Sequence, residues 1–420
     1  MLWVHRNRVG VCSLQVGCAS LLMFFYIITN HLGLIAFYLA ENGIKQLGTL
    51  NKQTVIEMAG YTSIVTLSYI LADLLVRNFK ADFRLVNIQT IRFERVHIFP
   101  LLVVTGLMTL ISVLKFLDGS PLLLMLSGDV EAALSGRVSN YSDQNTFLGI
   151  KPSYLKVIFE VGQFATILVL AKFMALKSLK YLALYIIMTF VVMLDSMSNV
   201  SKGALLMPIY HIWLVYSMLY VRFQIVNKFV IWALLITFVV VSVVSAAMMG
   251  NNFISFFYPL ERLMLGNLIP QYVVMDYFNK DNLLMGTSLP AWWSFGEHIQ
   301  FPIDEFAWKE LTHWAGGPYY TAPSSFVADS YANFHIYGVF GVSFIMFMLL
   351  CCIDLALMKI KSELVYVGLV GYCALHFSYL SAGGSLNFLF DYYAIASVLF
   401  ALFFYKKYRL SLSISTKKIV

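Results

Sequence analysis

The sequence predicts an all-α membrane protein that crosses the bilayer about ten times and carries one large loop on the outer side. Hydrophobic residues make up 60% of its 420 residues and charged residues only 12%, whereas globular domains carry about 25% charged residues. The mean hydropathy is +0.77. Aromatic residues reach 16%, as expected for a protein with aromatic belts at both membrane interfaces. This composition excludes an ordinary soluble domain.

Ten hydrophobic runs are each close to the roughly 20 residues that a bilayer core requires. The fifth and sixth are short, which indicates broken or tilted helices, or one hairpin that is divided wrongly. The first follows Arg6 and Arg8 as in a signal peptide, but its length predicts an uncleaved helix, irregular near 30–33. The runs cover about 11–39, 54–76, 98–117, 153–176, 181–197, 204–221, 229–249, 336–358, 364–381 and 386–404.

The lysines and arginines predict the orientation of these helices. Most of the 29 lie in the segments that are inside if the N-terminus is inside, and the longer outer segments hold fewer. By the positive-inside rule, both termini are then cytoplasmic. The net charge of +7 reflects this orientation and requires no nucleic-acid partner. The chain divides into seven helices (1–249), the large outer loop (250–335), and three helices with a basic tail (336–420).

Two kinds of inner segment are suited to the membrane surface. The segment 77–97 alternates basic residues, among them Arg92 and Arg95, with apolar ones. This pattern suits a helix in the inner interface, and a solvated loop is the alternative. The basic ends 1–8 and 406–418 are also suited to contact anionic membrane lipid.

Neither a metal site nor another cofactor is predicted. The five cysteines all fall in predicted spans, and none forms a CxxC pair, so the outer loop has no disulfide framework. His298 and His313 have no ligand-type spacing to each other or to a third group. A lone histidine is more often structural than catalytic.

Four ionisable residues lie in the outer half of the predicted bilayer, namely Glu160, Asp195, Lys202 and Asp391. Such groups are costly in a membrane and face either a cavity or a partner. A site for lipid head groups at the outer interface needs them there, whereas a transporter needs them along a path through the membrane. The alternative is structural pairing, for example of Asp195 with Lys202.

Two outer cations are candidate anion ligands. Lys202 lies in a short outer turn between a serine and a glycine, an arrangement that suits a phosphate oxygen. Arg137 lies in a polar, turn-rich outer segment, where a plain surface role is the alternative.

The large outer loop combines features of a sugar site and of a membrane interface. Its segment 251–277 has apolar residues at helical spacing and predicts one or two helices on the membrane surface, divided near Pro270. The segment 282–293 is rich in turn residues. Four of the seven tryptophans lie in this loop, interleaved with carboxylates. Aromatic rings beside hydrogen-bonding groups suit a sugar, and an interfacial belt is the alternative. These four are Trp292, Trp293, Trp308 and Trp314.

Three short motifs resemble the Wzy-type oligosaccharide repeat unit polymerases, also called O-antigen or capsular polysaccharide polymerases. The loop enters the next helix through an acidic residue, an aromatic residue, Asn-Phe and spaced glycines at 329–341. The Ser-Lys-Gly turn at 201–203 and the pair Glu261-Arg262 are also similar. Members of this family often have glycine after Asn-Phe, where this chain has His335.

The resemblance implies a GT-C-type glycosyltransferase of the bacterial inner membrane that acts on the periplasmic face. Its substrates would be undecaprenyl-pyrophosphate-linked oligosaccharides of lipopolysaccharide or capsule biosynthesis. A hydroxyl of one repeat unit would attack the anomeric carbon of the lipid-linked chain and release undecaprenyl pyrophosphate. A chain-length-regulating co-polymerase is an expected partner.

This chemistry implies three groups of site residues. The departing pyrophosphate needs cations, the attacking hydroxyl needs a base or acceptor, and the sugars need rings and polar groups. We expect the pyrophosphate at Arg262, Lys202 and Arg137, the base at Asp329, then His313 or His298, and the sugars at Trp308, Trp314 and Tyr319.

Two other functions remain alternatives. An O-antigen ligase uses the same donor but transfers the glycan to the lipid A core, and composition does not separate it from a polymerase. A flippase for lipid-linked sugars is a non-enzymatic alternative. The large outer loop and the charges confined to the outer half of the bilayer disfavour it.

Overall fold

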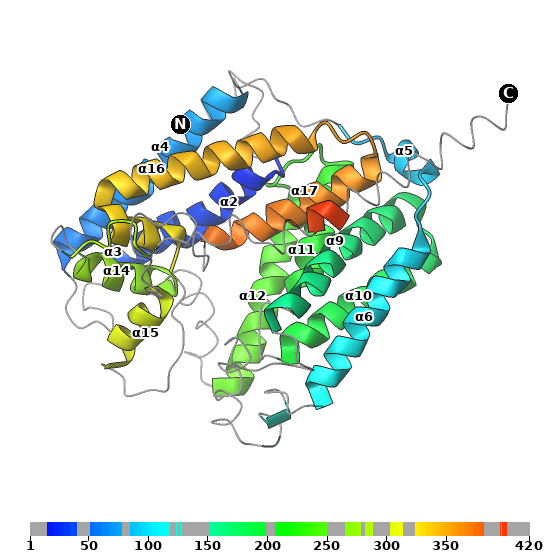
Figure 1. The fold of residues 1–420 in the computed structure, drawn as a ribbon, viewed down its shortest axis with the longest axis horizontal. Helices are drawn as coiled ribbons and strands as arrows, with labels where there is room; N and C mark the ends of the chain where they lie inside the picture. The colour runs from blue at the N-terminus through cyan, green and yellow to red at the C-terminus, as the bar shows by residue number, and fades with distance from the viewer. Residues whose placement is uncertain are drawn as a thin grey trace. The chain divides into compact units, whose positions relative to one another are not determined.

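The computed structural model describes most of the helices and some of the connections. The described residues form helices and turns, and no strand occurs among them (Figure 1). They are residues 15–39, 51–77, 85–117, 123–124, 127, 152–198, 206–249, 265–278, 282–288, 303–313, 324–381, 395 and 397–400.

The chain forms two compact units. Unit 1 consists of Met1–Phe83, Phe238–Ala356 and Ala374–Phe390. Unit 2 consists of Arg84–Thr237, Leu357–Cys373 and Asp391–Val420. Both units therefore contain residues from distant parts of the sequence.

Unit 1 begins with a helix that changes type midway. α2 (Cys18–Tyr26) continues through the π-helix η2 (Ile27–His31) into α3 (Leu32–Leu39). This confirms the irregularity expected near 30–33. Polar side chains of the π-helix make hydrogen-bonding contacts with other segments. The Asn30 amide donates to the Ser381 carbonyl at 3.3 Å, and His31 Nε2 lies 2.8 Å from Thr66 Oγ1.

Two long helices of unit 1 contact each other. α4 (Lys52–Arg77) begins after Asn51, whose side chain accepts the Gln53 N–H at 3.0 Å, as expected for a helix cap. α16 (Phe326–Leu357) begins well before the span expected from residue 336. The residues from Asp329 to Asn333, before the Phe of the Asn-Phe motif, therefore lie in a helix and not in a loop. The Tyr69 and Phe347 rings join the two helices, with centroids 5.2 Å apart.

Two short helices come from the expected outer loop. α14 (Leu268–Tyr277) and α15 (Ile303–His313) pack side by side, and α14 also contacts α3 and α4 (Figure 1). The expected division near Pro270 is confirmed, since a turn at 266–267 separates helical residue 265 from α14, and Pro270 lies in the first turn of α14, where no backbone N–H is needed. One face of α14 is buried against the unit, so it does not simply rest on the membrane surface.

Unit 2 is a group of helices around α9 (Pro152–Leu176). α10 (Leu179–Ser198) packs against α9 and α6 (Ile98–Leu117), while α5 (Ile88–Phe93) and α11 (Met207–Tyr220) pack against α9.

Three helices contribute residues to both units. α12 (Lys228–Met249) and α17 (Glu363–Ser378) are divided within their length, while α16 contributes only its last residue, Leu357, to unit 2. α17 ends in the 3-10 helix η4 (Tyr379–Ser381). Within unit 2, α17 approaches α9 closely at glycines. A Cβ atom on Gly368 would lie 2.8 Å from the Phe164 ring, so only glycine permits this packing.

Five helices within the described residues are long and apolar enough to cross a membrane. The first nine predicted runs each coincide with a helix, while most of 386–404 lies outside the described residues. A multi-pass membrane protein is therefore supported, and the count of ten stays a prediction. The five helices are Cys18–Ile35, Lys52–Val76, Val157–Leu176, Phe326–Leu357 and Glu363–Ser381, and three shorter apolar ones are Ile98–Leu114, Leu179–Leu194 and Lys228–Val239.

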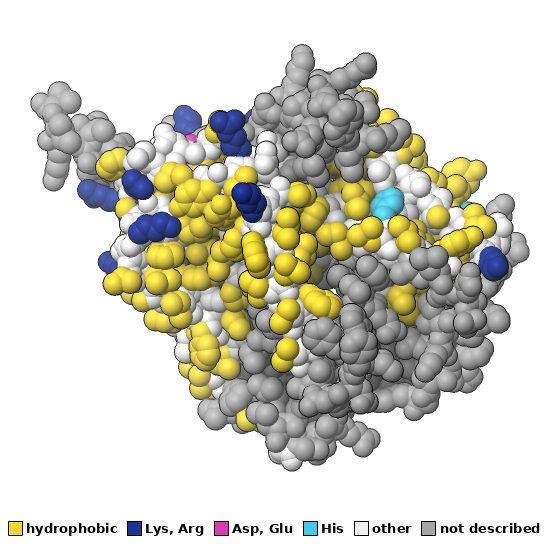
Figure 2. Space-filling view, turned by 180° about the vertical axis from the view of Figure 1, so that it is seen from behind, with side chains coloured by type: hydrophobic (Ala, Val, Ile, Leu, Met, Phe, Trp, Pro, Cys, Tyr) yellow, Lys and Arg dark blue, Asp and Glu magenta, His cyan; other side chains and the backbone are white. Residues whose placement is uncertain are grey.

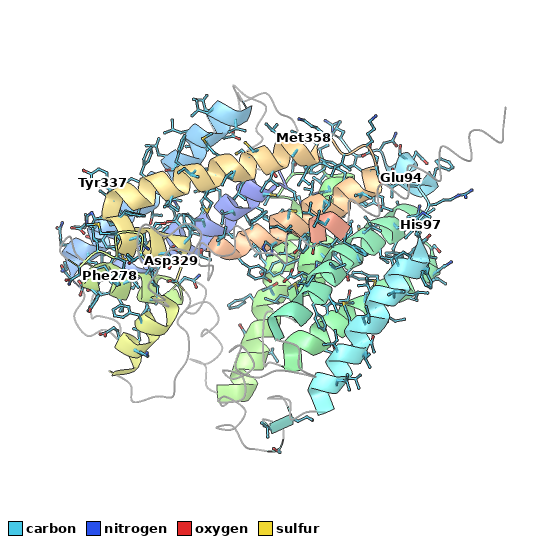
Figure 3. The ribbon with its side chains drawn as sticks, viewed as in Figure 1. Glu94, His97, Phe278, Asp329, Tyr337 and Met358 are labelled. Carbon is cyan, nitrogen blue, oxygen red and sulfur yellow. The ribbon has the colours of Figure 1, made fainter. Side chains whose placement is uncertain are left out.

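The connections of unit 2 that are expected on the inner side are joined by two charged side chains. Glu94, at the end of α5, accepts the N–H groups of Glu363 and Leu364 at 2.9 Å each and the Ser362 hydroxyl at 3.0 Å, and so caps α17 (Figure 3). Lys172 of α9 donates to three carbonyl groups at the end of α5. The segment 85–97, expected as an interfacial helix or a loop, therefore contains a short helix fixed at both ends.

Candidate functional site

Asp329 is the predicted site residue whose side chain the structure describes. It lies half-buried in the first turn of α16. Trp308 and His313 lie in α15, but their side chains are outside the described residues. The structure therefore does not test whether the predicted cations and rings meet Asp329. Arg137, Lys202, Arg262, His298, Trp314 and Tyr319 lie wholly outside the described residues.

α16 is broken at Phe334 and His335, about one and a half turns after Asp329. Phe334 has φ −138° and ψ 17°, and His335 has φ 54° and ψ −143°, so neither is helical. Asp329 lies before this break and Tyr337 after it (Figure 3). A positive φ is costly for a residue with a Cβ atom. Such strain persists only where the surrounding structure holds it, and it is often found at functional sites.

A turn from the expected outer loop holds the break. Met285 and Gly286 have φ of 49° and 85°, and the Thr287 N–H donates to the Leu284 carbonyl at 3.0 Å, as in a type I′ turn. The N–H groups of Leu284 and Met285 donate to the carbonyls of Ala332 and Asn333 at 2.9 and 3.1 Å. The turn thus satisfies carbonyl groups that the interrupted helix leaves without a partner. The turn-rich character expected for 282–293 is confirmed over 282–288.

Asn333 connects the turn to the helix. Its Oδ1 accepts the Gly286 N–H at 3.0 Å and lies 3.1 Å from Ser288 Oγ. Its Nδ2 donates to the Asp329 carbonyl at 2.8 Å. Asn333 is buried. The oxygen and the nitrogen of its amide both form hydrogen bonds that fix the backbone near Asp329. The Asn-Phe motif drew attention to Asn333, but nothing in the sequence indicated its hydrogen-bond partners.

Aromatic residues from two helices meet at the break. The His335 ring lies 4.7 Å from the Tyr331 ring and 6.2 Å from the Tyr61 ring of α4, and the two tyrosine rings are 5.2 Å apart. Sequence reasoning missed Tyr61, because its membership of this cluster depends on how α4 packs against α16.

α14 adds further hydrogen-bonding groups at the same end of α4. Asp276 accepts the Thr54 hydroxyl at 3.1 Å, and the Tyr272 hydroxyl accepts the Asn51 N–H at 2.9 Å. Burial raises the pKa of Tyr272, against the lowering effect of the Asn51 N–H. Tyr272 is therefore protonated at neutral pH and retains a proton to donate.

One of the four ionisable residues expected in the outer half of the bilayer has a described side chain. Glu160 is buried, and its carboxylate accepts the Tyr372 hydroxyl at 3.1 Å. For Glu160 the structural alternative, pairing within the helix bundle, is therefore the observed one. The side chain of Asp195, and all of Lys202 and Asp391, lie outside the described residues.

Within unit 1, the residues of α4, α14 and α16 around Asp329 form a polar and aromatic site at its expected outer end. It offers carboxylates, hydroxyl groups and rings, which are the groups that bind and orient a sugar hydroxyl. Within the described ranges, no group of three His, Cys, Asp or Glu residues is placed to hold a metal ion. No protein-family model, curated protein or solved structure matches this chain.

Proposed function

We propose that the protein is a Wzy-type polymerase, a GT-C-like glycosyltransferase of the bacterial inner membrane. It joins undecaprenyl-pyrophosphate-linked oligosaccharide repeat units on the periplasmic face. The observation that carries the proposal is the break in α16 at Phe334 and His335, which follows Asp329 within the motif that resembles this family. The positive φ at His335 supports it, because glycine adopts this conformation readily and similar proteins often have glycine there.

The proposed reaction needs an acceptor for one proton. A sugar hydroxyl oxygen attacks the anomeric carbon of the lipid-linked donor, its proton passes to Asp329, and the bond to the pyrophosphate oxygen breaks. Asp329 suits this role because its side chain is only half-buried, so that a sugar hydroxyl can reach the carboxylate. The site has no need of a metal if cations neutralise the leaving pyrophosphate.

The remaining predicted residues keep their proposed roles. Arg262, Lys202 and Arg137 neutralise the leaving undecaprenyl pyrophosphate, because arginine and lysine bind phosphate oxygens well. Trp308, Trp314 and Tyr319 stack on the sugars, and His313 and His298 are the other candidates for the base. These residues belong to the loop and helix ends that we place around Asp329.

The deciding experiment uses the purified protein and one defined lipid-linked repeat unit. We expect longer glycans and free undecaprenyl pyrophosphate from the unaltered protein. Asp329→Asn keeps the size of the side chain but accepts a proton poorly, so elongation should fall about 100-fold or more. Arg262→Ala and Lys202→Ala should also slow it.

Glu310→Gln is the matched control, since Glu310 is an exposed carboxylate on α15, and it should elongate at the normal rate. Full elongation by Asp329→Asn would remove Asp329 from the role of base. Absence of elongation by the unaltered protein, together with transfer of a glycan to lipid A core, would show a ligase instead. In cells, loss of a polymerase leaves lipopolysaccharide with a single repeat, whereas loss of a ligase leaves none.

A further inference from the structure

The inner connections of unit 2 expose positively charged side chains, whereas their carboxylates are hydrogen-bonded or buried. Glu94 accepts three hydrogen bonds at the start of α17, and Glu363 is buried. In the described part of these connections, the exposed charged side chains are therefore all basic. They are Arg92, Arg95, Lys177, Lys180, Arg222, Lys228, Lys359 and Lys361.

Large hydrophobic side chains are exposed beside these cations. Phe93 is 83% exposed, Leu179 79% and Leu85 61%. Lys and Arg side chains gather along one edge of a broad hydrophobic surface (Figure 2). Cations next to exposed apolar residues are typical of segments that lie at the interface of an anionic membrane.

Two of the cations are held against the end of α9. Arg92 Nε donates to the Ala175 carbonyl at 2.8 Å, which fixes the guanidinium beside the last turn of the helix. Lys177 Nζ lies 5.8 Å from the centroid of the Tyr220 ring, and the Tyr220 hydroxyl donates to the Met174 carbonyl at 2.8 Å. The two charges are thus positioned by contacts from α5 and α11, and they are not freely moving surface charges.

We propose that an anionic phospholipid of the inner leaflet binds here, at an inner basic surface formed by Arg92, Lys177 and Lys180 with Phe93 and Leu179. The phosphate group lies against the three cations, and an acyl chain covers the two hydrophobic side chains. A zwitterionic lipid carries its own cation beside the phosphate, so the three cations bind it less strongly. This site is independent of the proposed polymerase reaction, because it lies in unit 2 and on the opposite expected side of the membrane.

The test measures how strongly the immobilised full-length protein, in a mild detergent, retains labelled phosphatidylglycerol relative to phosphatidylcholine. The unaltered protein should prefer phosphatidylglycerol. The double variant K177Q/K180Q should lose this preference by roughly tenfold, because each basic residue near an anionic lipid contributes to binding. Neither lysine donates a hydrogen bond that the fold needs, and an unchanged thermal unfolding midpoint checks this.

The matched control is K52Q/K309Q, which removes the same charge from two exposed lysines on the expected outer side. It should retain the preference. An equal loss in both double variants would show a general effect of net charge and would overturn the site. Displacement of the lipid by inorganic phosphate at millimolar concentration would show a free-phosphate site instead, and would overturn the lipid assignment.

Discussion

At the scale of single residues, His335 is the position where the backbone conformation and the residue type disagree most clearly. Its φ of 54° lies in the region that L-residues with a Cβ atom avoid. Contacts on both sides hold it there, since Asn333 and the turn at Met285 fix the chain before the break and the Tyr61 and Tyr331 rings enclose the imidazole. The strain is thus a property of one residue that its neighbours maintain.

We predict that His335→Gly is more stable than His335→Ala. Both changes remove the imidazole ring, but only alanine keeps a Cβ atom at a positive φ, which costs about 1–2 kcal/mol. In an ordinary helix the order is reversed, because glycine there is less stable than alanine by roughly 0.5–1 kcal/mol. Thermal unfolding of the two variants in detergent measures the difference, and a more stable alanine variant would contradict the strained backbone.

At the scale of elements, helix ends in both units are stabilised by charged side chains from other helices. In unit 1, Asp354 of α16 accepts the Cys18 N–H at 2.7 Å at the start of α2. In unit 2, Glu94 caps α17 and Lys172 satisfies carbonyls at the end of α5. A helix N-terminus favours a carboxylate and a C-terminus favours a cation. These charges are therefore explained by helix ends and do not indicate a catalytic site.

We predict that Glu94→Gln lowers the free energy of unfolding by about 2 kcal/mol, because hydrogen bonds to a charged group contribute about 1.5–3 kcal/mol. The glutamine amide offers one acceptor oxygen where the carboxylate uses two. The midpoint of thermal unfolding should fall accordingly. Arg95→Gln, a change to the adjacent exposed residue, is the control and should leave the midpoint unchanged. Equal midpoints for both variants would show that the cap contributes nothing.

At the scale of the whole molecule, the topology decides which residues can share a site. The predicted orientation places the start of α4 and the start of α16 on the outer side, and the connections around Glu94 on the inner side. Within unit 1, the ring contacts between α4 and α16 near the break agree with this, since they join two ends expected on the same side. Within unit 2, the hydrogen bonds from Glu94 join two connections that are both expected inside.

We predict that a membrane-impermeant thiol reagent, applied to intact spheroplasts, labels a cysteine at position 52 but not one at position 228. Lys52→Cys and Lys228→Cys each replace an exposed lysine in a variant without the five native cysteines. Lys52 starts a helix on the expected outer side, and Lys228 starts one on the inner side. Both cysteines should react after permeabilisation. Labelling of position 228 in intact spheroplasts would reverse the orientation.

The sequence by itself determined where the membrane helices lie. Their hydrophobic runs are long, and a bilayer requires a continuous run of apolar residues, so α4, α6, α9 and α12 begin and end close to the expected residues. The sequence also indicated the irregular turn near 30–33, because it depends on neighbouring residues. The position of Asp329 in the motif also made it a candidate site residue.

Only the tertiary structure decided how polar residues far apart in the sequence are used. The helical start of α16 was missed because polar residues at 329–333 suggest a loop, whereas burial and the bonds of Asn333 keep them in a helix. The pairing of Glu160 with Tyr372 and the capping by Asp354 likewise join residues more than 200 positions apart. Such contacts follow from the packing of whole helices, and local sequence patterns do not indicate which helices pack against each other.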